Sequence, residues 1–177
     1  MSRKLKEFEV FGMKFRTLQA GAVAAFAEVN RTGPLDPMAV LPLIEVLDEH
    51  EHWVALDSKQ RSNEYIRERT GFVPAHVVLE SVLAAWSEVN VGFLRDWKPI
   101  KVPSYLRSER EPRQARGIDP ILASIINSKQ ATLRDLEEFY SGEDAINLFD
   151  VSMAAKLDEA DAQYQAHKES KAKARSR

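Results

Sequence analysis

Apolar residues recur at helical spacing near the C-terminal end of this 177-residue chain. Six of them follow one another at steps of three, four, four, three and four residues: Ile146, Phe149, Met153, Leu157, Ala160 and Tyr164. Because an α-helix turns once every 3.6 residues, this spacing places all six side chains on one face. The pattern predicts a long terminal helix with a continuous apolar face that must be covered by another part of the chain or by a partner.

Residues typical of helix starts occur before the predicted terminal helix and at its first turn. Asp119 comes directly before Pro120, which joins a capping carboxylate to a residue suited to the first helical turn. Thr132 and Ser141 are each followed three residues later by an aspartate, which is the spacing of a capping box. Residues 118–167 are therefore predicted to form a compact C-terminal helical unit.

The N-terminal residues follow a different period. Apolar and charged residues alternate on both sides of a glycine in residues 7–17, which predicts a short β-hairpin. Glu7 and Glu9 would then face Lys14 and Arg16 across the hairpin. Two strands alone are marginally stable, so the hairpin must pack on the segment that follows it.

Helical patterns dominate residues 18–97, which follow the hairpin. We expect a first helix over residues 18–30 and a second that begins at Asp36-Pro37 and presents Leu43, Ile44 and Leu47. A polar helix is expected from Asp57 or Ser58 to Arg69. A central, buried helix is expected from Val73 to Trp97. The predicted fold class is therefore mainly α. A short N-terminal β-hairpin is followed by a helical bundle, a Pro-rich arm and the C-terminal helical unit.

Two other segments lack a sustained helical period. Residues 98–117 contain three prolines and are predicted to form a linker or an extended arm. Residues 168–177 hold five basic residues and one acidic residue, and are predicted to be a flexible basic tail. The expected order along the chain is the hairpin with its bundle over residues 1–97, the arm, the helical unit over residues 118–167, and the tail.

Charge is unevenly distributed along the chain. The net charge of −2 offers no overall attraction to nucleic acid. Locally, however, seven basic residues stand against three acidic ones between Arg95 and Arg116, and the last ten residues are also basic. These segments are either a solvated linker and tail or contact sites for an anionic partner.

The residue types that catalysis needs do not come together in the sequence. The chain has no cysteine, which excludes disulfides and thiolate metal sites and indicates a reducing compartment. The seven glycines form no phosphate-binding loop. Glu49 and His52 have the spacing of a di-metal carboxylate helix, but no second copy of that motif occurs, so they are expected to be a solvated helix end. We expect no catalytic, cofactor-binding or metal-ligating residue, and a protein that binds other proteins rather than an enzyme.

Signals for export or membrane insertion are also missing from the sequence. The N-terminal residues are positively charged but lead into no apolar run, which argues against a signal peptide. No stretch approaches the roughly 18 uncharged apolar residues that a membrane span needs. We therefore expect a cytoplasmic protein without a membrane partner.

Four residues are candidates for contact with a partner: Trp97, Tyr105, Leu157 and Tyr164. Trp97 directly precedes the arm and Tyr105 lies in its first part, and at such positions an aromatic ring can pack internally or on another protein. Leu157 and Tyr164 lie where the terminal helix is expected to run past its packing partners. We therefore expect these two to contact a client protein or a second copy of the chain.

An apolar helix, a Thr-Leu-x-x-Leu segment and a Tyr-Ser-x-x-Asp helix start follow one another in residues 118–164. The matching positions are Thr132, Leu133, Leu136, Tyr140, Ser141 and Asp144. This order resembles the C-terminal part of the tail assembly chaperones of long-tailed bacteriophages. The resemblance covers between a quarter and a third of the chain, and its motifs are mainly capping and packing residues.

The resemblance implies a chaperone in the cytoplasm of the bacterial host that coats the apolar, helical tape measure protein before the tail tube forms around it. It also implies contact with tail tube subunits. Two other roles remain open: a structural protein of the particle, such as a connector or tail completion subunit, and a small nucleic-acid-binding regulator. The helix after Ser141 begins with acidic and apolar residues, which argues against DNA contact.

Overall fold

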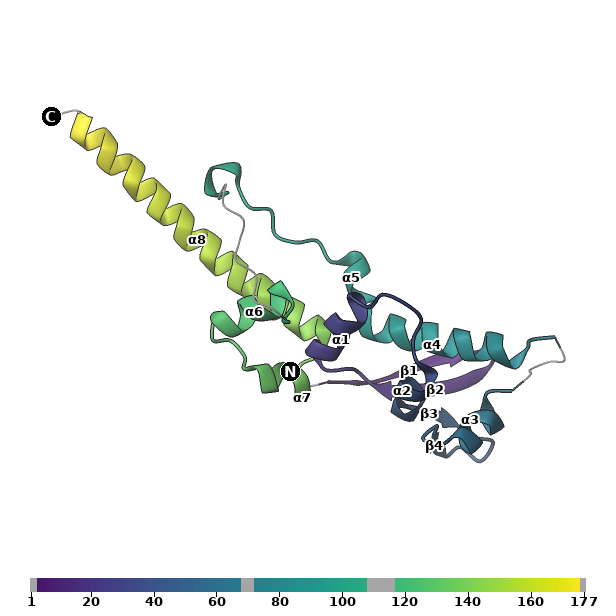
Figure 1. The fold of residues 1–177 in the computed structure, drawn as a ribbon. Helices are drawn as coiled ribbons and strands as arrows, with labels where there is room; N and C mark the ends of the chain where they lie inside the picture. Colours follow the sequence, from purple (N-terminus) through teal and green to yellow (C-terminus); the bar gives the residue numbers. More distant parts are fainter. Residues whose placement is uncertain (1–2, 68–71, 108–116, 176–177) are drawn as a thin grey trace.

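A four-stranded antiparallel sheet opens the chain, and helices make up most of the rest (Figure 1). The computed structural model of the protein describes residues 3–67, 72–107 and 117–175. The sheet has the order β1-β2-β3-β4, and its strands are β1 (Leu5–Val10), β2 (Met13–Leu18), β3 (Ile44–Leu47) and β4 (Trp53–Ala55).

The predicted N-terminal hairpin is confirmed as β1 and β2. Glu7 pairs with Arg16 and Glu9 with Lys14, so each acidic residue lies opposite a basic one. The two-residue turn is Phe11-Gly12, and both residues have positive φ, at 47° and 76°. A turn with two positive φ values matches the right-handed twist of the flanking strands, and this explains the tight connection.

The prediction of a helix that presents Leu43, Ile44 and Leu47 was wrong. That helix is limited to α2 (Pro37–Val40) and a 3₁₀ turn, η1 (Leu41–Leu43), after which the chain becomes β3. Ile44 and Val46 are buried while their neighbours are half-exposed, so the true period is two. The N-terminal region therefore combines a sheet with helices and is not a hairpin on a helical bundle.

The remaining helices begin close to the predicted signals. They are α1 (Ala22–Val29), α3 (Lys59–Tyr65), α4 (Ala75–Val91), α5 (Phe93–Asp96), the 3₁₀ turn η2 (Ser104–Leu106), α6 (Pro120–Asn127), α7 (Leu133–Glu138) and α8 (Gly142–Arg175). The side chains of Asp119, Thr132 and Ser141 accept hydrogen bonds from backbone amides at the starts of α6, α7 and α8, as predicted. Ser58 caps α3, but that helix ends at Tyr65, short of the predicted Arg69, which lies outside the described residues.

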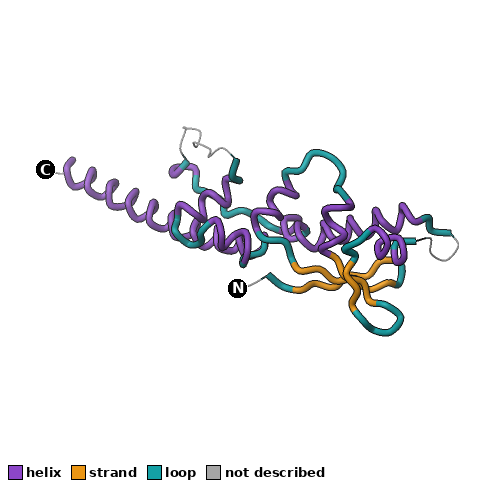
Figure 2. Tube along the Cα trace, turned by 60° about the horizontal axis from the view of Figure 1, so that its bottom comes forward, coloured by secondary structure: helices purple, strands orange, loops and turns teal. Residues whose placement is uncertain are grey.

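A first core lies between the sheet and α4. Helices lie on one side of the strands (Figure 2). The buried strand residues Phe15, Ile44 and Val46 pack in one cluster with Val78 and Val82 of α4. Because inward-facing residues alternate along each strand, one sheet face is apolar and the other carries charged side chains.

A second core joins segments from both halves of the chain. Phe26 of α1 packs with Leu122 and Ile125 of α6, Leu136 of α7 and Ile146 of α8. The predicted separation of residues 1–97 from residues 118–167 therefore does not describe the packing. A helix of the N-terminal part is built into the C-terminal core.

Backbone contacts at Gly21 and a buried amide connect the two cores. A Cβ atom at Gly21 would lie 2.0 Å from the carbonyl oxygen of Glu137, so only glycine permits this approach. The next amide, that of Ala22, donates to the carbonyl oxygen of Tyr140 at 2.7 Å. In α4, the buried Asn90 side chain accepts from the Ala20 amide at 2.6 Å.

We predict that Asn90→Ala destabilises the whole protein. The substitution removes a buried side chain that bonds both the partly buried Ala20 amide and the Trp86 carbonyl oxygen, and the loss of these hydrogen bonds costs about 1–3 kcal/mol. Urea unfolding followed by circular dichroism measures the loss. Asn63→Ala, at an exposed position of α3, is the matched control and should change the free energy of unfolding by no more than about 0.5 kcal/mol. Equal effects of the two substitutions would contradict a structural role for Asn90.

We also predict that the two fragments of a chain cut within the arm remain associated under native conditions. The N-terminal fragment keeps α1, and Phe93, Leu94 and Trp97 also pack against the second core. Size-exclusion chromatography should show a single species in buffer and two fragments in strong denaturant. Two separate species in native buffer would show that the second core does not hold the halves together.

Candidate partner-binding face

The predicted apolar stripe lies on α8, a helix of 34 residues. Its first member, Ile146, is only 4% exposed and belongs to the second core. Met153 and Leu157 are half-buried, and Tyr164 is 41% exposed. Burial therefore decreases along the helix, which projects away from the other elements toward the C-terminus (Figure 1).

The helix continues through most of the predicted flexible tail. It ends at Arg175, so residues 168–175 are helical, while residues 176–177 lie outside the described part. Alanines at three positions of the last ten helical residues favour this state, and Glu169 precedes Lys173 by four residues, the favourable order for a helical pair. Basic residues near a helix C-terminus also complement the helix dipole.

Helix α6 contacts α8 on one side of the stripe. The hydroxyl groups of Ser128 and Ser152 are 2.8 Å apart and form a hydrogen bond. One turn further on, Lys156 Nζ donates to Ser124 Oγ at 3.4 Å. These polar contacts fix α8 against α6 beside the apolar face, and the apolar residues of α6 cover only the first part of that face, around Ile146 and Phe149.

An aromatic contact directly before the arm lies on the other side of the stripe. Trp97 Nε1 donates to Asp150 Oδ2 at 2.9 Å. The indole also meets Phe149 edge to face, with ring centroids 6.3 Å apart. Trp97 is half-buried, so its apolar body packs while its N–H is satisfied by a carboxylate.

A second aromatic contact lies further along the arm and α8. Tyr105 OH donates to Asp161 Oδ1 at 2.8 Å, and its ring lies 4.8 Å from that of Tyr164. The hydrogen bond to Asp161, together with partial burial and the negative charge of that carboxylate, raises the pKa of Tyr105. Tyr105 is 50% exposed, so this contact lies at the surface.

The structure thus brings the predicted partner-contact residues to one region of α8. Tyr105 lies on Tyr164, Trp97 lies on the base of the stripe, and Leu157 lies between these two contacts on the helix. Part of the predicted arm, residues 98–107, runs beside α8, and residues 108–116 lie outside the described part.

Sequence reasoning missed the two aspartates that hold the arm. Asp150 and Asp161 each come directly after a stripe residue, so both flank the apolar face on the same side. That position was the available signal. The position of the aspartates was not sufficient to predict their contacts with the arm. Acidic residues beside an apolar stripe are common on solvated helices, and they do not reveal which aromatic residue binds them.

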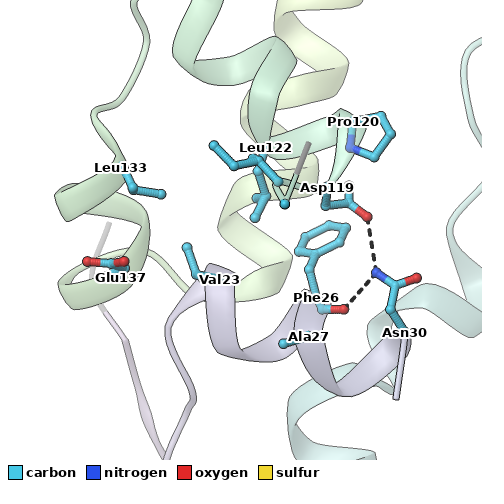
Figure 3. A pocket seen from close by; sticks show the side chains of 11 residues that line it. Val23, Phe26, Ala27, Asn30, Asp119, Pro120, Leu122, Leu133 and Glu137 are labelled. Carbon is cyan, nitrogen blue, oxygen red and sulfur yellow. Dashed lines mark hydrogen bonds between the residues drawn. The ribbon is translucent and has the colours of Figure 1, made fainter. Parts of the chain in front are cut away.

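An apolar cavity of about 690 Å³ lies between α1, the start of α6 and α7 (Figure 3). Val23, Phe26, Leu122 and Leu133 contribute apolar walls. At its polar edge, Asn30 Nδ2 donates to the Phe26 carbonyl oxygen at 3.0 Å and to Asp119 Oδ2 at 3.3 Å (Figure 3). The Asp119 carboxylate is already used to cap α6. The cavity is a hollow beside the second core, and its two lining carboxylates, Asp119 and Glu137, come from the start of α6 and from α7.

The predicted helix end around Glu49 and His52 is instead the turn between β3 and β4. Asp48 Oδ1 accepts from the amides of His50 and His52, at 2.9 and 2.7 Å. These backbone hydrogen bonds lower the pKa of Asp48 and close the turn. Among the residues that the structure describes, no three His, Cys, Asp or Glu side chains come together in a way that could hold a metal ion.

We predict that the arm loosens from α8 at alkaline pH. A tyrosine pKa raised in the folded state means that the contact contributes stability below the ordinary value of about 10 and loses it as the pH rises through the folded-state pKa. The phenolate can no longer donate to Asp161 and is repelled by it. Side-chain methyl NMR signals of Val102 and Leu106 should shift in a step above about pH 10.

The hydroxyl group supplies the matched control for this titration. Tyr105→Phe keeps the ring but has no proton to lose, so the step should vanish. Asp161→Asn keeps an acceptor oxygen without the negative charge and should move the step to lower pH. A step that persists unchanged in Tyr105→Phe would assign it to another group.

The comparisons with known proteins return no relative for this chain. It matches no protein-family model, no curated protein and no solved structure. Within the described residues, no helix combines the length and the apolar character needed to cross a membrane.

Proposed function

We propose that this chain is a tail assembly chaperone of a long-tailed bacteriophage, which binds the tape measure protein on α8 and helps to recruit tail tube subunits. The observation that supports this proposal is the apolar stripe of α8. It continues from the second core to Leu157 and Tyr164, where the helix projects from the other elements (Figure 1). A helical face of this kind suits a partner helix with its own apolar stripe.

The cover that the arm provides is weak enough for a partner to replace it. Tyr105 and Tyr164 are 50% and 41% exposed, and the hydrogen bond to Asp161 lies at the surface. A hydrogen bond at the surface contributes little net free energy, because water can satisfy both partners when the bond breaks. Burial of apolar area against a client helix would contribute more free energy than this contact and would cover Leu157 more completely.

The residues that carry the family resemblance also support this role through the fold. Thr132 and Ser141 form capping boxes that start α7 and α8, and Leu136 is fully buried between them. These residues set the direction in which α8 leaves the second core. In the proposed chaperone, they therefore position the binding face without contacting the client.

We predict that Leu157→Asp with Tyr164→Asp abolishes client binding and leaves the fold intact. Both residues lie on α8 beyond the residues that form the second core, so circular dichroism should retain its helical signal. A charged group on the binding face must lose its water when a client helix packs on it, which weakens binding at least tenfold. Co-purification with a co-expressed helical fragment of a tape measure protein measures the effect.

The matched control is Ala155→Asp with Ala162→Asp. These exposed positions lie on the opposite face of α8 and add the same charge. The control should retain the client as well as the unchanged chain does. If both double variants retain it, α8 is not the binding face. If the unchanged chain retains neither a tape measure fragment nor a tail tube subunit, the chaperone role is wrong, and a structural role in the particle becomes the better reading.

A further inference from the structure

The apolar face of α8 continues beyond Tyr164 as a basic face. Lys168 follows Tyr164 by four residues, and Lys171 follows Lys168 by three, which repeats the spacing of the stripe. At about 100° per residue, both lysines lie within roughly 40° of Tyr164 around the helix axis. Among the side chains that the structure describes, one side of α8 therefore presents apolar residues first and then two cations.

These two lysines are available to a partner. Both are exposed, and neither has an ion-pair partner among the residues that the structure describes. The nearest acidic residues lie elsewhere on the helix: Glu169 points to a different side, and Asp161 accepts from Tyr105. The charge at the end of this face is thus not neutralised within the described chain.

We propose that α8 takes a partner helix in antiparallel orientation, with acidic residues in its first turns and an apolar stripe after them. The acidic turns of that helix lie against Lys168 and Lys171, and its apolar residues lie against Tyr164, Leu157 and Met153. This inference rests on the proposed function and specifies the chemistry of the client segment that the face accepts.

Charge and helix dipoles both favour this orientation. Acidic residues are stabilising near a helix N-terminus, where the dipole is positive, and basic residues near a C-terminus. An antiparallel pair places the N-terminal end of the partner beside the C-terminal end of α8. The acidic first turns then meet the two lysines, while the dipoles of the two helices oppose each other favourably.

The same face is less suited to nucleic acid. Two lysines one turn apart can contact few phosphates, and the residues before them on this side are apolar or aromatic rather than basic. Binding to duplex DNA also needs a wider basic surface than a single row of side chains along one helix. A nucleic acid is therefore an alternative outcome of the experiment and is not the proposed partner.

Three synthetic helical peptides test the proposal with the full-length protein. They share one apolar stripe with heptad-like spacing and differ only at two pairs of positions, one pair near each end, which hold glutamate or glutamine. The first has two glutamates in its first two turns, the second has the same glutamates in its last two turns, and the third has glutamines at both ends. Fluorescence anisotropy of labelled peptides at low and high salt gives the dissociation constants.

The peptide with N-terminal glutamates should bind about three- to tenfold more tightly than the other two, the range expected from two surface ion pairs. The advantage should shrink at high salt, because exposed ion pairs are screened. Lys168→Gln with Lys171→Gln should remove the advantage without changing affinity for the glutamine peptide. Ala162→Glu with Ala166→Glu changes the net charge equally on the opposite face and should leave the preference intact.

The outcomes separate this inference from the proposed function. If all three peptides bind equally, the face binds helices but does not select acidic ones, and only the inference is overturned. Tighter binding of the C-terminal glutamate peptide would overturn the antiparallel orientation. If no peptide binds, the inference and the use of α8 as a helix-binding face both fall. Preference for a labelled DNA duplex over every peptide would overturn the inference in favour of an anionic polymer.

Discussion

The close approach of Gly21 to the end of α7 determines how the two halves of this protein meet. A side chain at this position would overlap the Glu137 carbonyl group, so the backbone passes only because glycine has no Cβ atom. The contact, with the hydrogen bond from Ala22 to Tyr140, carries the chain from the sheet into α1 and the second core. The direction of α8 depends on this junction, because α8 starts directly after it.

The first turns of α8 serve stability, and its later turns are exposed for contact. Ala145 and Ile146 are buried in the second core, whereas Tyr164 lies at the surface against Tyr105. Gly142 permits the same kind of approach at the helix start, since a Cβ atom there would lie 2.7 Å from the ring of Phe93. The buried base and the projecting end are therefore parts of one helix with different energetic roles.

The arm and α8 share contacts that are aromatic on one side and acidic on the other. Trp97 and Tyr105 each place a ring on the helix and a donor on an aspartate. A contact of this type fixes the orientation of the aromatic ring, but at the surface it contributes only a modest stabilising free energy. A segment held in this way can stay in place without a partner and give way to one that buries more apolar area.

Local patterns in the sequence were enough to predict the hairpin, the capping residues of α6, α7 and α8, and the apolar stripe. Each of these depends on residues within a few positions of one another, where turn geometry and helix capping act directly. The four candidate contact residues were identified for the same reason, since aromatic and apolar side chains at element boundaries are visible without a fold. Their mutual proximity was not predictable, because it joins the arm to a helix more than 50 residues away.

The sequence by itself determined where the chain turns, where most of its helices start and which face of α8 is apolar. Only the tertiary structure decided that Ile44–Leu47 forms a strand, because a four-residue segment with three apolar residues and one glutamate suits either state until β2 and β4 pair with it. It also decided that α1 belongs to the second core, since Phe26 packs with residues about 100 positions away. Such contacts depend on the surface that each element buries against the others, which no local pattern specifies.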